Sequence, residues 1–168
     1  SGINFDQNKN PAGVTTVDGH ASDPGPVSTP PAPAADGPPV DEGSLLWSDA
    51  RKLGYAPMDR THEVFYAVAF RLLTCGDDDA AAAIAAFEDH AVEHFGQEEA
   101  WMHESAFPAA QCHVDEHAAV LASVSEVRAM LVSGQAGPAL LHDLAQHLFA
   151  WFPGHADYLD SALAAWMS

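Results

Sequence analysis

The stretch WFPGHADYLD, residues 151–160, decides how this chain can fold around its histidines. It lies within LLHDLAQHLFAWFPGHADYLDSALAAWM, where apolar residues recur at three- and four-residue steps and predict an α-helix. Pro153 and Gly154 interrupt that helix, because proline removes a backbone hydrogen bond and glycine adds an entropy cost. His155 and Asp160 follow at a spacing that places them about 140° apart around an ideal α-helix. A regular helix therefore cannot turn both side chains toward one centre.

Three more helical segments precede this one. The expected helices span residues 59–75, 77–105, 108–133 and 138–167. Asp59, after Pro57, is the expected N-cap of the first helix, and the acidic residues 77–79 suit the start of the second. Four helices with short connections predict an all-α, antiparallel up-down four-helix bundle, and no strand pattern competes with it.

The N-terminal region has a different composition. Eight of the 12 prolines fall within the first 40 residues, and PGPVSTPPAPAADGPPVDEG has no periodicity. We therefore expect residues 1–44 to form a Pro-rich, disordered tail or linker. Residues 45–168 would hold the bundle, with SLLWSDARKLGYAPMD as a partly apolar lead-in against its core.

Composition restricts the possible partners. The 168 residues suffice for one domain, 48% are hydrophobic, and the formal net charge is −18. An acidic surface repels phosphate backbones and anionic lipids, so we expect neither a nucleic-acid nor a membrane partner. No apolar run approaches the roughly 20 residues of a membrane span, and no signal-peptide pattern is present. Cys75 and Cys112 fit reduced, small apolar residues of a cytoplasmic protein.

Histidines and carboxylates recur on the expected helices at spacings that suit a metal. Each helix contributes its own set, and together they are His62, His94, Glu98, His113, His117, His155 and Asp160. Side chains four residues apart share one helix face, and antiparallel packing would bring the sets to a similar level in the core. Each residue alone is also explained as a surface or core residue. Burying all of them without a metal would be costly, however, which favours a metal site.

Seven ligands are too many for one tetrahedral zinc ion. They suit two metal ions near octahedral coordination, with the carboxylates bridging and one position left for an external ligand. Imidazole-rich, carboxylate-bridged sites suit iron, although copper, manganese or zinc can occupy them.

Four segments of the chain resemble the hemerythrin family: MDRTHEVF, HFGQEEAWM, FPAAQCHVDEH and WFPGHADYLD. They follow the family's order and spacings over about residues 45–165. The resemblance implies a di-iron centre bridged by an oxo or hydroxo group. By this resemblance His113, His117 and His155 hold one iron, and His62 and His94 hold the other, which keeps an open position for dioxygen. Glu98 and Asp160 would bridge both.

The function that the resemblance implies is reversible dioxygen binding for storage, delivery or sensing. Phe65, Trp151 and Phe152 are candidates for the apolar dioxygen pocket, and ordinary core packing explains each equally well. The alternative is a di-iron redox enzyme: an oxidase, a peroxidase or a nitric-oxide-handling protein. Five histidines against two carboxylates, with no further acid or base evident, favour binding over turnover. A third hypothesis is a sensor whose Pro-rich tail joins a signalling or other domain.

The remaining polar residues are given lesser roles. His90 lies one turn before His94 on the same face and could contact it, but we expect it to be a partly exposed residue near the helix end. We expect the other histidines to lie on the surface or rim: His103, His142 and His147. The acidic residues that flank the ligands are expected to form a solvated face: Glu93, Glu99, Asp115 and Glu116. Finally, we predict a π-type bulge or kink between about residues 149 and 160, because only such a deviation aims both ligands inward.

Overall fold

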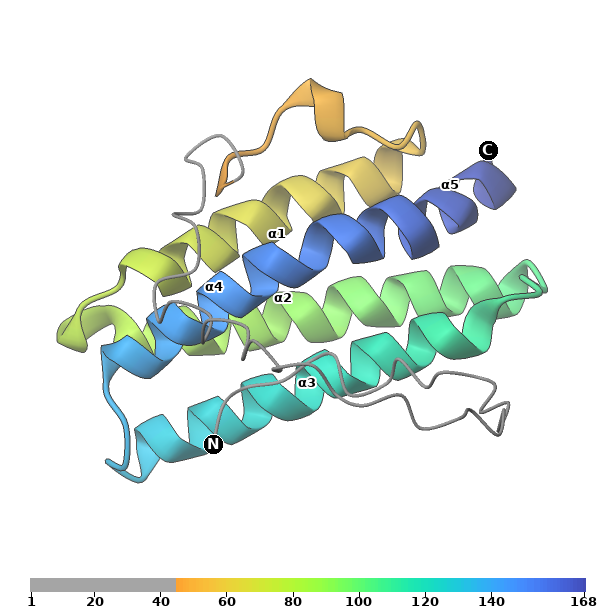
Figure 1. The fold of residues 1–168 in the computed structure, drawn as a ribbon. Helices are drawn as coiled ribbons and strands as arrows, with labels where there is room; N and C mark the ends of the chain where they lie inside the picture. Colours follow the sequence, from red (N-terminus) through yellow and green to blue (C-terminus); the bar gives the residue numbers. More distant parts are fainter. Residues whose placement is uncertain (1–44) are drawn as a thin grey trace, which may run out of the picture.

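The computed structural model describes residues 45–168, and the predicted tail over residues 1–44 lies outside them. Four long helices pack side by side as an antiparallel bundle (Figure 1). They are α1 (Ala56–Thr74), α2 (Asp77–Glu104), α3 (Ala110–Val132) and α4 (Pro138–His155), and α5 (Ser161–Met167) continues the line of α4. The predicted all-α bundle is confirmed, and residues 45–168 contain no strand. None of the helices in this range is both long and apolar enough to cross a bilayer.

The helix starts differ from the prediction at two places. α1 begins at Ala56, with Tyr55 at its N-cap, so the prediction that Asp59 caps the helix is wrong. Pro57 fits the first turn, where its missing N–H would have no intrahelical partner. α3 begins at Ala110 rather than at Pro108, which lies in the turn before it.

Asp59 instead holds the segment that precedes α1. Its carboxylate accepts hydrogen bonds from the backbone N–H groups of Leu53, at 2.7 Å, and Gly54, at 3.3 Å. This segment, residues 45–55, contains the short 3-10 helix η2 (Asp49–Arg51) and runs beside α1 (Figure 1). We call it the N-terminal arm. Arg51 ties it down by donating a 2.8 Å hydrogen bond to the Tyr66 hydroxyl of α1.

The helix interrupted by Pro153 and Gly154 does deviate as predicted. Between α4 and α5 the chain forms a π-helical turn, η3 (Ala156–Asp160), in which the Ser161 N–H donates to the Ala156 carbonyl five residues earlier. Five-residue closure brings side chains five apart onto one side of the helix. Asp160 is consequently 0% exposed, so the predicted π-type deviation is confirmed.

Two apolar clusters flank the polar centre of the bundle. The larger cluster includes Phe65 of α1, Phe95 of α2 and Phe152 of α4, whereas the smaller contains Met58 and Met102. Full burial of such a side chain contributes about 1.5–3 kcal/mol relative to leaving it exposed. Since the candidate ligands on α1 and α2 lie between members of these two clusters, apolar packing on both sides fixes the level at which they meet.

Candidate metal centre

The bundle core contains all seven residues that the sequence singles out as metal ligands. They come from α1, α2, α3, α4 and the π-helical turn, and none is more than 3% exposed. Each is brought inward by the periodicity of its own helix, except Asp160, which depends on the π-helical turn. The structure therefore brings together every predicted ligand.

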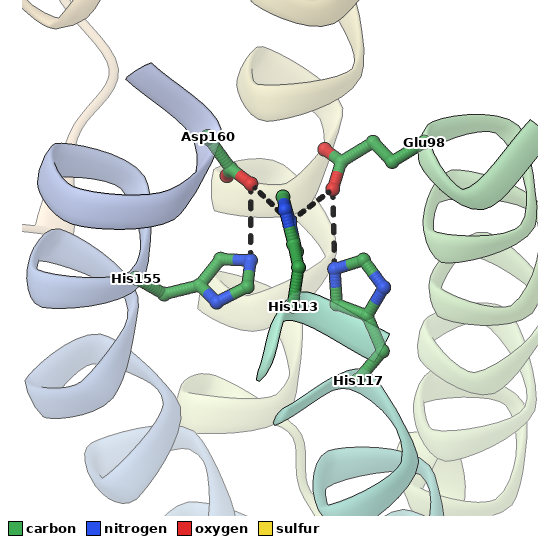
Figure 2. A group of neighbouring side chains, drawn as sticks. All are labelled: Glu98, His113, His117, His155 and Asp160. Atoms are coloured by element: carbon green, nitrogen blue, oxygen red, sulfur yellow. Dashed lines mark hydrogen bonds and ion pairs between the residues drawn. The ribbon is translucent and has the colours of Figure 1, made fainter. Parts of the chain in front are cut away.

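Five of these residues form one tight group, shown in Figure 2. Ligand atoms of Glu98, His113, His117, His155 and Asp160 all lie within 4.8 Å of one another. The Asp160 Oδ1 atom lies 2.8 Å from His113 Nε2 and 3.1 Å from His155 Nε2. The Glu98 Oε2 atom lies 3.1 Å from the Nε2 atoms of both His113 and His117. Three imidazoles and two carboxylates thus face a common point.

A second group shares one carboxylate with the first. Ligand atoms of His62, His94 and Glu98 lie within 4.8 Å of one another. The His94 Nε2 atom lies 2.8 Å from Glu98 Oε1, and the His62 Nε2 atom lies 3.0 Å from Asp160 Oδ2. Each carboxylate therefore presents one oxygen to each group, as two bridging ligands would.

The hydrogen-bond geometry tests whether these residues fit a metal. The Nε2 atoms of His62, His117 and His155 are buried without a hydrogen-bond partner, as are both oxygens of Asp160. They lie 3.0 to 3.1 Å from opposing ligand atoms, yet they are not aligned to donate or accept. Buried polar atoms without partners cost free energy, and a cation between them would satisfy several at once. The donor set fits a metal site.

Charge within the cluster shifts the protonation equilibria of its members. Burial lowers the pKa of His62 and of His155, but the nearby carboxylates outweigh it and raise these values to about 9 and about 10. Burial raises the pKa of Glu98 and of Asp160, but the surrounding histidines hold both below their ordinary values. Without a metal, the cluster therefore pairs imidazolium charges on His62 and His155 with the carboxylates of Glu98 and Asp160.

Three residues outside the seven contact the outward nitrogens of the ligand histidines. The Glu99 carboxylate lies 3.3 Å from His117 Nδ1, and the Glu116 carboxylate lies 3.2 Å from His155 Nδ1. The prediction that these two glutamates only form a solvated face is wrong. Neighbouring helices bring the histidines to them, and pairing across helices has no signature in the spacing along one helix. His90, which we expected to be partly exposed, is half-buried and also contacts a ligand histidine: its Nε2 atom lies 3.2 Å from His94 Nδ1, one turn away.

The aromatic residues predicted to form the dioxygen pocket divide between the two groups. Phe65 and Phe152 stack with ring centroids 4.1 Å apart, and Phe152 contacts His62 edge-on at 5.0 Å. Trp151 lies instead against His155, at 4.4 Å, and its indole N–H donates to Glu116. The two phenylalanines thus lie beside the two-histidine group, whereas Trp151 lies beside the three-histidine group.

A cavity of about 190 Å³ lies between the N-terminal arm, α1 and the α4 end of the bundle. Its wall includes His62 and Phe152, together with Arg51 and Tyr66. This cavity is therefore next to the two-histidine group and has one cation and one hydroxyl in its wall.

The other residues considered at the sequence level take peripheral places. His103 and His147 are exposed, as predicted. His142 is half-buried, and its Nε2–H donates a 2.7 Å hydrogen bond to the Cys75 carbonyl. Cys75 and Cys112 are both free thiols, but Cys112 is exposed, so its expected packing as an apolar residue is wrong. None of these side chains reaches the cluster.

The fold and the cluster together define a class of protein: four-helix bundles whose cores carry a metal centre built from facing helices. Comparison with known proteins narrows that class. Residues 53–167 match the family model described as Hemerythrin HHE cation binding domain. The chain is also 35% identical over 124 residues to a bacteriohemerythrin from Ralstonia nicotianae, covering 74% of this chain and 89% of that protein. The chain belongs to the hemerythrin family.

Proposed function

We propose that this protein binds dioxygen reversibly at a centre of two non-haem iron ions bridged by an oxo or hydroxo group. The observation that carries the proposal is the convergence of buried imidazole and carboxylate atoms, many without hydrogen-bond partners, from every helix of the bundle. Membership of a family whose matched domain is described as cation binding supports it. Similarity to a protein named bacteriohemerythrin also supports an oxygen-binding role.

Each ligand has a defined place in this proposal. His113, His117 and His155 would hold one iron, and His62 and His94 would hold the other. Glu98 and Asp160 would be shared between the two positions, because each presents one oxygen to each group. Bound iron would supply the electrons that pass to dioxygen when it binds. The two-histidine position has fewer protein ligands, so it would be the one open to dioxygen.

Phe65 and Phe152 support reversibility through their position. Their stacked rings lie against His62 and His94, where they exclude water from the open position. A dry, apolar surrounding slows loss of charged products and protons, and the protein's contribution to such chemistry is control of access and polarity. The 190 Å³ cavity beside His62 supplies a space through which a small ligand can approach.

The redox-enzyme alternative is favoured by one specific observation. The Arg51 guanidinium and the Tyr66 hydroxyl, 2.8 Å apart, both line the cavity that His62 reaches. They give this cavity the polar groups that a purely apolar pocket would lack. An oxidase or peroxidase would use such groups to orient or protonate a reduced oxygen species.

One experiment separates these functions. The metal-free protein is loaded with Fe²⁺ under anaerobic conditions, exposed to air, and then returned to vacuum while the visible spectrum is recorded. A charge-transfer band that forms in air and bleaches on deoxygenation supports reversible binding. Immediate, permanent oxidation with release of hydrogen peroxide contradicts it and favours the redox enzyme. The variant His103→Ala, changed at an exposed histidine outside the cluster, is the matched control.

Whether bound dioxygen is stored, delivered or sensed depends on whether the chain acts on a partner. A cytoplasmic store or carrier would need no partner beyond dioxygen itself. A sensor would couple the bundle to a signalling domain through residues 1–44, and the N-terminal arm, which covers the cavity beside His62, offers a direct link. Dioxygen-dependent changes in proteolysis of the arm in the full chain would favour sensing over storage.

A further inference from the structure

The two groups of histidines differ in the residues that contact their outward Nδ1 atoms. In the three-histidine group, His117 Nδ1 lies 3.3 Å from Glu99 and His155 Nδ1 lies 3.2 Å from Glu116. In the two-histidine group, the corresponding partner of His94 is the imidazole of His90, at 3.2 Å. Carboxylates therefore contact the outer nitrogens of two histidines at one metal position. At the other position, a neutral imidazole contacts the outer nitrogen of His94.

From this asymmetry we propose that Glu99 and Glu116 are positioning residues that make the three-histidine position the tighter metal site and the one that better stabilises an oxidised ion. The proposal rests on the proposed function, because it concerns the same metal centre. It adds that the two positions differ in role: the three-histidine position binds its ion more tightly, and the two-histidine position binds the external ligand.

The physical basis is the effect of an outer carboxylate on a ligand imidazole. A histidine that binds metal through Nε2 carries its proton on Nδ1, and a carboxylate that accepts this proton fixes the tautomer and the ring orientation. The negative charge also makes Nε2 a stronger donor. A neutral imidazole such as His90 fixes the tautomer without adding charge. His90 itself is held by a hydrogen bond to the Thr61 backbone.

Glu116 is held in place by contacts with two side chains of α4. One oxygen, Oε1, accepts from both the Trp151 indole N–H, at 3.1 Å, and His155, at 3.2 Å. The Trp151 ring also packs on the His155 ring, with centroids 4.4 Å apart. Glu116 is only 35% exposed, so water screens its charge less than at an open surface site. The α3 carboxylate, the indole and the α4 imidazole therefore fix one another.

The third histidine of the same group serves as an internal comparison. His113 Nδ1 is buried and has no hydrogen-bond partner. The outer carboxylates are therefore not a general feature of buried histidines in this bundle. They occur at His117 and His155, whose outer edges face partly exposed positions on neighbouring helices.

The test measures metal affinity rather than dioxygen binding. In a His94→Ala background, which removes a ligand of the two-histidine position only, the remaining Zn²⁺ site is titrated against a chelator. We expect Glu116→Gln and Glu99→Gln each to weaken Zn²⁺ binding roughly 10- to 100-fold. Glutamine keeps the accepting oxygen and removes the charge, so the folded structure is retained. Circular dichroism of the metal-free proteins checks this.

Matched controls remove a nearby charge that touches no ligand. Asp115→Asn alters the neighbour of Glu116 in the sequence, and Asp115 accepts a hydrogen bond from Gln111. Glu93→Gln alters an exposed glutamate of α2. These variants should bind Zn²⁺ within threefold of the background. An equal loss in the controls, or a loss below threefold in both test variants, would overturn the proposal while leaving the centre intact. Failure of the unaltered protein to bind any metal would instead refute the proposed function.

A second readout responds to charge and not to packing. In the iron-loaded protein with His94 intact, Glu116→Gln should raise the reduction potential of one iron, because the lost carboxylate favoured the more positive ion. Asp115→Asn should leave the potential unchanged. A potential that does not move in Glu116→Gln contradicts the electronic part of the proposal.

Discussion

His62 and Asp160 meet in the core, with His62 Nε2 3.0 Å from Asp160 Oδ2, although their helix positions lie almost a hundred residues apart. The contact exists because the π-helical turn Ala156–Asp160 rotates Asp160 inward. The same carboxylate faces His113 and His155 through its other oxygen. One local departure from α-helical geometry thus connects the ligands of α1, α3 and α4.

Removing this carboxylate should damage both stability and metal binding. Asp160→Ala removes one of the two carboxylates at the centre of the cluster and leaves Glu98 to face His62 and His113. Loss of one partner from a buried pair typically costs about 3–5 kcal/mol. We expect a lower urea midpoint for the metal-free protein and fewer than two bound metal ions. Asp157→Ala, at an exposed position of the same turn, is the control and should retain both properties. Two tightly bound ions in Asp160→Ala would refute the bridging role.

Gly154 should be replaceable although it lies just before His155. A Cβ atom added there meets nothing within 4 Å, and its φ is not in the left-handed region. Gly154→Ala should therefore increase stability by about 0.5–1 kcal/mol, because alanine loses less entropy in a helix. Metal stoichiometry should not change. Loss of metal in Gly154→Ala, seen by elemental analysis, would show that the π-helical turn needs the glycine.

Phe152 should contribute to both the core and the dioxygen pocket. Phe152→Ala removes the ring that stacks on Phe65 at 4.1 Å, and such truncations cost about 3–5 kcal/mol. Water would enter beside His62, so the oxygenated form should oxidise faster. Phe70→Ala, which truncates a ring that is 41% exposed, should cost much less and leave oxidation unchanged. Thermal unfolding and the decay of the visible band measure the two effects.

Asp59 should hold the N-terminal arm rather than the helix start. Asp59→Ala removes the acceptor for the N–H groups of Leu53 and Gly54, with an expected cost of about 1–2 kcal/mol. Hydrogen exchange should accelerate at these two amides of the arm before any region of α1 changes. Asp49→Ala, at an exposed position of the same arm, should leave their exchange unchanged. Uniform acceleration along α1 would support the N-cap role instead.

Metal binding should release protons. The pKa of His62 is raised to about 9 and that of His155 to about 10, so both are charged at pH 7 in the metal-free protein. Ligand imidazoles must be neutral, so Zn²⁺ uptake at pH 7 should acidify a weakly buffered solution. Zn²⁺ affinity should then rise between pH 6 and pH 9. An affinity independent of pH over this range would contradict the prediction.

The same shifts determine the stability of the metal-free protein. Because both folded values lie above the ordinary histidine pKa of about 6.5, their stabilisation is complete below that pH and is lost as pH rises through 9 to 10. The Asp160 pKa is lowered, so its contribution is present above about pH 4 and lost as pH falls. The pKa of the half-buried His90 is lowered to about 4, so stability also falls as pH drops below about 6.5. Urea midpoints of the metal-free protein should therefore be highest near about pH 6.5.

The sequence contains the bundle and most of its centre in local patterns. His94 with Glu98, and His113 with His117, share a face because four residues make slightly more than one helical turn. Even the π-helical turn was predictable, since His155 and Asp160 cannot converge from a regular helix. Asp59 was misassigned because an acidic residue near a helix start suits several hydrogen-bond partners, and only the folded arm selects one.

Spacing along single helices is therefore enough to predict the candidate ligands, the helices that carry them and the need for one irregular turn. The carboxylates that contact the outer nitrogens of those candidate ligands follow from packing between helices instead. Glu99 reaches His117 from α2 to α3, and Glu116 reaches His155 from α3 to α4. Such contacts depend on the rotation and axial offset of neighbouring helices, which are set by packing of the whole apolar core.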